Sequence, residues 1–284
     1  MTARVGPEVK WAASRLAQAG VDSSMLDAQL LMAHTLCCSR LDVIAHPERV
    51  LSEAERAEFV ESVERRAGRY PLAYLIGHRE FYGLDIVVAP GVLIPRPETE
   101  LLVEVCLKRL HGKENAQIAD IGAGSGAIAV ALASNLPGAK VYATEISPDA
   151  LKVARTNLEK HQLVGRVELL AGDLLAPIAR LGLRFDAIVS NPPYIPSDEI
   201  ERLEPEVRDF EPRLALDGGP DGLDAYRRLL PESLCLLDEA GFVAVEIGAG
   251  EAEAVRTIAL AAGYRDVEIT NDLAGIERVV VACA

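Results

Sequence analysis

The chain has 284 residues, enough for two domains, and a net charge of −14. This charge disfavours nucleic acid as a ligand, because attraction to phosphate dominates such binding. The charge is uneven, since residues 1–75 carry nine basic and ten acidic side chains and the rest of the chain carries 20 and 33. Half of the residues are hydrophobic, yet no stretch approaches about 18 uninterrupted apolar residues, which excludes an ordinary membrane-spanning helix.

Five cysteines and five histidines are scattered along the sequence, without C-x-x-C spacing or paired histidines. This usage favours free thiols in a reducing compartment over disulfides or a metal site. The first residues contain no apolar segment of the kind found in secretory signals. We therefore expect a cytoplasmic protein that binds no metal and does not enter a membrane.

Residues 1–72 carry only helical patterns. Apolar residues recur at helical spacing over residues 7–19 and stop at Gly20, and Asp22 or Ser23 can cap a second helix. Ser52 and Glu55 form a capping box that opens a third helix. Because no catalytic pattern appears here, we expect a helical N-terminal domain, residues 1–72, that recognises the substrate.

Residues 73–96 are expected to link this domain to the next. They contain β-type residues around Gly83, which is typical of a hairpin. Residues 96–100, Arg-Pro-Glu-Thr-Glu, then begin a helix with proline early and acids in the first turn. An ordinary helix start and a role in a binding site explain this pentapeptide equally well.

From residue 117 onward, short apolar runs alternate with helical segments. We predict strands at residues 118–121, 140–146, 167–170, 185–190 and 242–247, with helices between them, the last over residues 223–237. A terminal hairpin, residues 267–270 and 279–282, adds one antiparallel strand. Such alternation indicates an α/β fold with a doubly wound parallel sheet and right-handed crossovers.

A glycine-rich loop, residues 122–126, follows the first strand and opens a helix, so its backbone can approach a ligand closely. Glu145 ends the second strand, where it can accept both hydroxyls of a ribose, as in NAD or S-adenosylmethionine sites. Asp173 ends the third strand and is placed to bind an adenine amino group, with Leu174 beside the ring. The candidate cofactor-binding residues are Gly122, Ala123, Gly124, Ser125, Gly126, Glu145, Asp173, Leu174 and Asn191.

The fourth strand ends in Asn191-Pro192-Pro193-Tyr194. The two prolines stiffen the corner and hold the asparagine extended, so the Asn191 amide and the Pro192 carbonyl can accept from one planar –NH2 group. Tyr194 would pack on the plane of that group. A proline-rich turn with a core tyrosine is the plainer interpretation of these four residues. Two acceptors that hold an –NH2 group suit methyl transfer to its nitrogen and have no use in hydride transfer. This corner, together with the glycine loop and Glu145, therefore favours S-adenosylmethionine over NAD.

These stretches resemble the peptide chain release factor glutamine N5-methyltransferases, the HemK/PrmC family. The resemblance implies a helical N-terminal domain and, over residues 97–284, a Rossmann-like class I S-adenosylmethionine-dependent methyltransferase domain with a seven-stranded, mostly parallel sheet. It also implies substrate binding and catalysis by Asn191, Pro192 and Tyr194, with Pro193 in the substrate site. The stretches that carry the resemblance are residues 93–100, 120–129, 191–195, 211–219, 221–223 and 272–276.

The function implied is methylation of the glutamine side-chain nitrogen in the Gly-Gly-Gln motif of release factors, by a monomer without direct contact to nucleic acid. A ribosomal-protein glutamine methyltransferase would share the catalytic motifs, an adenine N6-methyltransferase of nucleic acid shares Asn-Pro-Pro-Tyr, and a non-catalytic cofactor-binding module is a further alternative. We also expect the long acidic stretch after the corner, residues 195–220, to border the substrate rather than to be an ordinary surface loop.

Overall fold

The computed structural model describes residues 3–284, so the first two residues of the predicted N-terminal domain lie outside the described part. The chain divides into two compact units. One contains the described residues up to His78 together with Glu204–Phe210, and the other contains Arg79–Leu203 and Glu211–Ala284. Among residues 3–284, no helix is long and apolar enough to cross a membrane.

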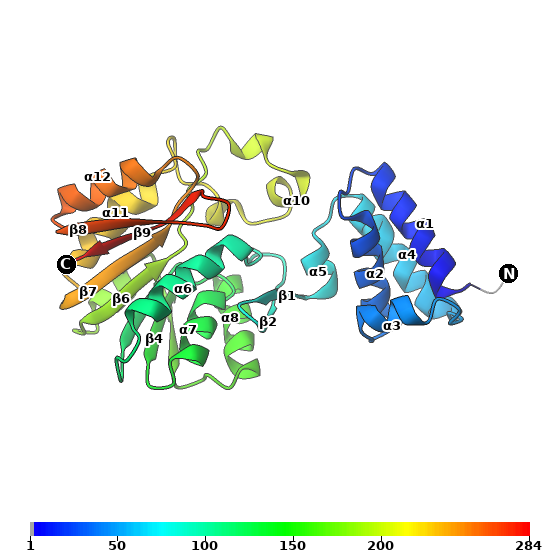
Figure 1. Ribbon diagram of the computed structural model, residues 1–284, viewed down its shortest axis with the longest axis horizontal. Coiled ribbons are helices and arrows are strands. Elements are labelled where there is room, and N and C mark those ends of the chain that lie inside the picture. Colours follow the sequence, from blue (N-terminus) through cyan, green and yellow to red (C-terminus); the bar gives the residue numbers. More distant parts are fainter. Residues whose placement is uncertain (1–2) are drawn as a thin grey trace. The chain divides into compact units, whose positions relative to one another are not determined.

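The first unit is helical (Figure 1). Its capping boxes come from Ser52 with Glu55, as predicted, and from Ser39 with Asp42, which opens a short helix that the periodicity did not predict. The core contains the apolar faces of these helices, including the buried side chains of Leu16, Leu31 and Phe59. The helices are α1 (Val5–Gln18), α2 (Ser24–Thr35), α3 (Arg40–Ala45), α4 (Glu53–Ala67) and α5 (Leu72–Ile76).

The segment Glu204–Phe210, which holds the short helix α10 (Pro205–Arg208), belongs to this helical unit although the residues on both sides of it in sequence belong to the second unit. The Glu206 carboxylate accepts hydrogen bonds from Arg66 at 2.8 Å and from Arg69 at 2.6 and 2.7 Å. The Phe210 ring lies edge-on to Tyr70, with 5.1 Å between ring centroids. Charge and aromatic contacts therefore hold this segment on the helical unit.

The second unit is built on one seven-stranded sheet in the order β5-β4-β3-β6-β7-β9-β8. The first five strands in this order are parallel, and β9 runs antiparallel to both β7 and β8. The chain order reverses between β3 and β6, which is the switch point where open α/β sheets bind ligands. The strands are β3 (Gln117–Ile121), β4 (Lys140–Glu145), β5 (Val167–Ala171), β6 (Phe185–Ser190), β7 (Leu237–Glu246), β8 (Asp266–Asn271) and β9 (Glu277–Cys283).

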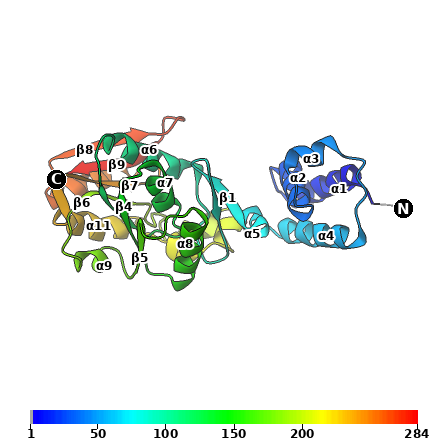
Figure 2. The same cartoon turned by 90° about the horizontal axis from the view of Figure 1, so that it is seen from below.

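Helices cover both faces of this sheet. Helices α6, α7 and α8 lie side by side on one face, and α11 and α12 pack together on the other (Figures 1 and 2). A separate two-stranded hairpin, as predicted, precedes the sheet. These elements are β1 (His78–Phe81), β2 (Leu84–Val87), α6 (Glu100–Arg109), α7 (Ala127–Asn135), α8 (Pro148–Lys160), α9 (Ala176–Ala179), α11 (Asp224–Leu234) and α12 (Ala252–Ala262).

The predicted strands are all present, in the class I methyltransferase arrangement expected from the resemblance, but β7 begins at Leu237 and not at residue 242. The predicted helix over residues 223–237 is wrong at its end, because α11 stops at Leu234. Leu237 already pairs with Phe185 of β6 and begins β7, so the chain must leave the helix by Cys235. Residues 97–99 form a 3-10 turn, η1 (Pro97–Thr99), before α6; two further 3-10 turns are η2 (Ile200–Arg202) and η3 (Arg213–Ala215).

Candidate active site

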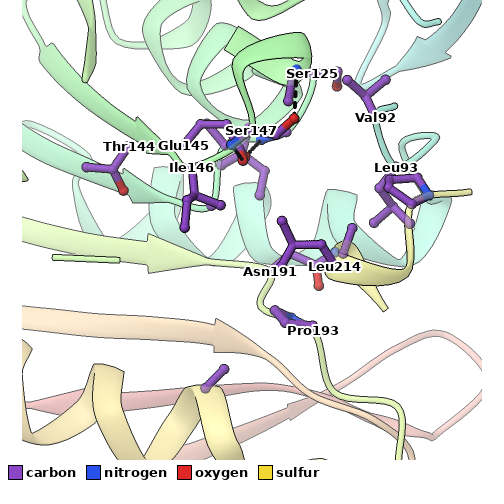
Figure 3. A pocket seen from close by; sticks show the side chains of 18 of the residues that line it. Val92, Leu93, Ser125, Thr144, Glu145, Ile146, Ser147, Asn191, Pro193 and Leu214 are labelled. Atoms are coloured by element: carbon purple, nitrogen blue, oxygen red, sulfur yellow. Dashed lines mark hydrogen bonds between the residues drawn. The ribbon is translucent and has the colours of Figure 1, made fainter. Parts of the chain in front are cut away.

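A cavity of about 350 Å³ opens at the carboxyl ends of β3, β4 and β6, within the second unit. The glycine loop, Glu145 and Asn191 all line it, which brings together the two stretches that the sequence analysis singled out. Figure 3 shows Glu145 and Ser147 on one side of the cavity and Asn191, Pro193 and Leu214 on another. The lining comes from parallel strand ends, where ligands bind in folds of this kind.

The glycine loop is tied to the end of β4. The Gly124 amide donates to Glu145 Oε2 at 2.8 Å, and the Ser147 amide donates to Glu145 Oε1 at 2.8 Å. Gly122 and Gly124 have φ of +73° and +56°, a backbone conformation that favours glycine. The carboxylate is thus held in place by backbone donors, while each of its oxygens keeps a lone pair for a ligand hydroxyl.

Asp120 lies beneath this loop and is completely buried. Its Oδ2 accepts from the Ala129 amide in the first turn of α7 at 3.0 Å, and burial raises the pKa of the carboxyl to about 7. The nearby charge of Glu145 acts in the same direction. A buried acid here braces the turn between β3 and α7 and couples its charge to that of Glu145.

The far end of the cavity is lined by Asp173, Leu174 and Ile146. Ile146 is an exposed large apolar side chain directly after Glu145, and the sequence analysis did not select it. The Asp173 carboxylate pairs with Arg228 at 2.5 Å, and both side chains are about half exposed. Such a pair contributes little energy, so the Asp173 oxygens remain open to a ligand.

Asn191 follows β6 directly and lies at the cavity with Pro193, whereas Pro192 and Tyr194 are not among the lining residues. The Asn191 side chain donates from Nδ2 to Thr99 Oγ1 at 3.0 Å. Thr99 is buried in the turn η1, so residues 96–100 contribute to the site beyond starting a helix. The contact of Tyr194 with a substrate amide stays a prediction.

The Tyr194 backbone is enclosed by glycines of the following loop. A Cβ on Gly218 would lie 2.8 Å from the Tyr194 Cα atom, and a Cβ on Gly222 would lie 2.4 Å from its carbonyl oxygen. The Tyr194 hydroxyl donates to Glu246 Oε1 at 3.4 Å. These close approaches give a physical reason for the glycines at both positions and fix the course of the corner.

Arg96, which lines the cavity directly before η1, forms an ion pair with Glu211. The Glu211 carboxylate, almost completely buried, accepts from Arg96 at 2.6 Å and from the Ile94 amide at 3.1 Å. Burial nevertheless raises the pKa of Glu211, against the lowering effect of Arg96. Since breaking a buried pair leaves one charge uncompensated, this contact holds residues 94–96 to the start of the segment after residue 210.

The loop of residues 195–220 is held at both ends. Ile195 and Asp217 form a parallel bridge, in which the Ile195 amide donates to the Leu216 carbonyl and the Gly218 amide to the Ile195 carbonyl, each at 2.9 Å. Its middle, Glu204–Phe210, belongs to the helical unit. Leu214, Ala215 and Asp217 line the cavity, and the expectation that this segment borders the substrate stays a prediction.

Two buried polar residues at or near this site were not selected from the sequence: Thr144, which lines the cavity, and Glu246, which contacts Tyr194. Thr99 belongs to the noted stretch 96–100, but its pairing with Asn191, 92 residues away, carries no sequence signal. Glu246, however, is the last residue of β7, and an acid at the end of a predicted buried strand is the same signal that selected Glu145. Among residues 3–284, no group of three or more His, Cys, Asp and Glu side chains is arranged to hold a metal ion.

Comparisons with known proteins concern the family and the fold. A family model described as the PrmC N-terminal domain matches residues 9–77, and one described as the methyltransferase small domain matches residues 97–203. A methyltransferase structure from Pyrococcus furiosus shares the fold, with a TM-score of 0.54 and 22% identity over 72% of this chain and 90% of that one.

Two relatives cover almost the whole chain. A release factor glutamine methyltransferase of Moorella thermoacetica is 50% identical over 272 residues, which is 95% of each chain. One of Geobacter sulfurreducens is 45% identical over 270 residues, 95% of this chain and 93% of that one. The chain therefore belongs to the release factor glutamine methyltransferase family.

Proposed function

We propose that the protein transfers a methyl group from S-adenosylmethionine to the side-chain nitrogen of the glutamine in the Gly-Gly-Gln motif of release factors. One observation carries this proposal: Asn191 and Pro193 line the same cavity as the glycine loop and Glu145. Asn191 can offer its amide oxygen to a substrate –NH2 group, and the glycine loop and Glu145 suit a nucleoside. Membership of the family supports the choice of substrate.

The residues present fit this cofactor. Glycines leave the loop side of the cavity open, Glu145 keeps lone pairs for two ribose hydroxyls, and Asp173 offers a carboxylate to an adenine amino group beside Leu174 and Ile146. Two apolar side chains suit the faces of a flat base. When bound, S-adenosylmethionine supplies an electrophilic methyl group on a positively charged sulfur.

The protein's own contribution is to position a poor nucleophile, since the lone pair of an amide nitrogen is delocalised into its carbonyl. Asn191 Oδ1 and the Pro192 carbonyl each accept one N–H of the glutamine amide. Holding both protons turns the nitrogen towards the methyl group, and such positioning supplies much of the rate. As positive charge develops on the nitrogen, the two acceptors stabilise it electrostatically, and one proton is then lost to water.

The helical unit is the second contact on the release factor in this proposal. Several large apolar side chains of this unit are exposed, including Leu41 and Ile44 on α3, as is common in surfaces that bind other proteins. Replacing Leu41 by Asp should raise KM for intact release factor and leave kcat unchanged, as loss of uniform binding predicts. An unchanged KM in steady-state assays would remove α3 from this role.

The substrate class is tested by incubating the protein with methyl-labelled S-adenosylmethionine and three kinds of acceptor: intact release factor, ribosomal proteins, and adenine-containing nucleic acid. We expect label in release factor and none in nucleic acid, in keeping with the net charge of −14. Label mainly in ribosomal protein or nucleic acid would overturn the proposal. Light scattering checks the expected monomer, and the proposed substrate implies action in the cytoplasm.

A further inference from the structure

Asn157 is a completely buried amide in α8, a helix that lies beside both α7 and β2 (Figure 1). The Val87 amide, in β2, donates to Asn157 Oδ1 at 2.7 Å, and Asn157 Nδ2 donates back to the Val87 carbonyl at 2.9 Å. Nδ2 also donates to the Ser125 carbonyl, in the glycine loop, at 2.8 Å. One side chain therefore joins α8 to segments that lie 70 and 32 residues earlier in the sequence.

The backbone of Val87 determines which way the Asn157 amide faces. An N–H group can only donate, so the atom of Asn157 that meets the Val87 amide must be the oxygen Oδ1. Nδ2 then faces two carbonyl oxygens, and its two protons match them. Because the contact with Ser125 is buried, its loss would leave a carbonyl of the glycine loop without a partner, which is unfavourable.

The face of α8 that carries Asn157 also supports the glycine loop by packing. Ala154 lies one turn earlier on the same face and is completely buried. A Cβ on Gly126, whose φ is +79°, would lie only 3.3 Å from the Ala154 Cβ atom. Because Glu145 holds another amide of this loop from the end of β4, the loop is fixed both from β4 and from α8.

We propose that Asn157 is a positioning residue for cofactor binding, which holds the Ser125 carbonyl and thereby sets the backbone of the glycine loop. This inference rests on the proposed function, in which S-adenosylmethionine is the ligand of that loop. The three glycines of residues 122–126 give the free backbone many conformations. A fixed contact within the loop reduces the conformational entropy that is lost when the cofactor binds, and so strengthens binding.

The first test measures cofactor binding to the full-length protein by calorimetry, without release factor. Asn157→Ala should weaken the binding of S-adenosylmethionine and of S-adenosylhomocysteine about tenfold each, because the two share the same nucleoside. Asn157→Asp keeps the shape and the acceptor for the Val87 amide but places an oxygen against both carbonyls, so binding should weaken at least as much. In Asn157→Ala, KM for the cofactor should rise about tenfold, whereas kcat at saturating cofactor should fall no more than about threefold.

Two matched controls separate this role from a general loss of stability. Ser233 is also completely buried in a helix, and its hydroxyl donates to the Leu230 carbonyl at 3.0 Å, but neither residue lines the cavity. Lys160, at the end of α8, pairs with Asp85 next to β2 residue Leu84 at 2.7 Å, so it contacts the hairpin and not the glycine loop. Ser233→Ala and Lys160→Ala should bind the cofactor within about twofold of the wild type. Weakening in either control equal to that in Asn157→Ala would overturn the inference.

A measurement on the wild type tests the same claim even if the Asn157 variants fail to fold. Hydrogen exchange at the Val87 amide requires that this amide separates from Asn157 Oδ1. Because the same side chain holds the glycine loop, saturating S-adenosylmethionine should slow this exchange at least about threefold, although Val87 does not line the cavity. The Gly83 amide, which donates to Glu80 in the same hairpin, is the control and should change less than about twofold.

The outcomes distinguish this inference from the proposed function. Unchanged exchange at Val87 on cofactor binding, or equal cofactor affinity in the wild type and Asn157→Ala, would overturn the inference. If the wild type binds neither S-adenosylmethionine nor S-adenosylhomocysteine, the proposed cofactor is wrong instead. If it binds both but labels no release factor, the proposed substrate is wrong, and the binding and exchange measurements still decide the role of Asn157.

Discussion

The two halves of the cavity are built in different ways. On the cofactor side, Glu145 is held by backbone amides of Gly124 and Ser147, only 21 and 2 residues away. On the substrate side, Asn191 and Glu211 are held through Thr99 and Arg96, which are 92 and 115 residues away. The first half is a local property of one sequence motif, whereas the second exists only in the folded sheet. Substitutions around Glu145 should therefore change mainly the binding of cofactor, and substitutions around Asn191 should change mainly turnover.

The largest effect is expected from Asn191→Ala. Turnover of release factor should fall by about 10²-fold or more, because an oriented contact to the developing charge is lost. S-adenosylmethionine affinity should fall much less, since the glycine loop and Glu145 remain. Rapid-quench single-turnover assays and calorimetry measure the two quantities. Asn271→Ala is the matched control, because Asn271 also ends a strand with one side-chain hydrogen bond but lies outside the cavity. A wild-type rate in Asn191→Ala would refute the proposed amide grip.

Glu145→Ala should have the reverse effect of Asn191→Ala: it should weaken cofactor binding and change turnover little. Cofactor affinity should fall about 10–100-fold, which corresponds to about 1.5–3 kcal/mol for hydrogen bonds to a charged group. At saturating cofactor, kcat should recover to within a few-fold of the wild type. Glu168→Ala, on the neighbouring strand β5 and half exposed, is the control in the same calorimetric titration. Unchanged cofactor affinity in Glu145→Ala would contradict the assignment of the ribose site.

The buried acid of the substrate half should also affect stability. The pKa of Glu246 is raised from 4.5 to about 7 in the folded protein, so the folded state binds more protons than the unfolded state between these pH values. Stability from this group is therefore lost as pH rises from about 4.5 to 7. The free energy of unfolding of Glu246→Gln, relative to that of the wild type, should rise by about 1–3 kcal/mol when the pH is raised from 5 to 8. Calorimetric Tm values at both pH values check this, and a constant difference between the two proteins would argue against it.

The smallest effect concerns the helical unit, where Arg69 and Glu206 are mostly buried. A double-mutant cycle of Arg69→Ala and Glu206→Ala should give a coupling energy of about 1–2 kcal/mol, between the values for exposed and buried pairs. The exposed pair Arg15 and Glu64 is the control and should couple by no more than about 0.5 kcal/mol. Denaturation followed by fluorescence of the single tryptophan, Trp11 in α1, reports on this unit. Equal coupling in the two pairs would show that Glu204–Phe210 is not held specifically.

The sequence predicted the sheet well because buried parallel strands are short apolar runs between helical segments. The glycine loop and Glu145, which line the cavity, could be selected for the same reason, because a glycine loop and an acid at a strand end are local signals. The error at the end of α11 arose because the apolar pattern continues through Leu237, and pairing of Leu237 with Phe185 decides the boundary. The short helices α3 and α5 hold too few turns for periodicity to reveal.

The substrate half could be predicted only in part. Asn191 and its prolines were recognisable as a stiff corner, but Thr99 carries no signal that connects it to a residue 92 positions later. Arg96 and Glu211 belong to stretches that were noted, yet their pairing depends on the return of the chain after residue 210. Contacts of this kind become visible only when the strand order places distant segments at one edge of the sheet.

The most direct measurement of the central claim is mass spectrometry of intact release factor after reaction with the wild-type protein and S-adenosylmethionine. The account predicts one added methyl group, located by fragmentation on the side-chain nitrogen of the Gly-Gly-Gln glutamine, and no detectable product with Asn191→Ala in the same time. A methyl group on any other residue, or equal product from both proteins, would contradict it.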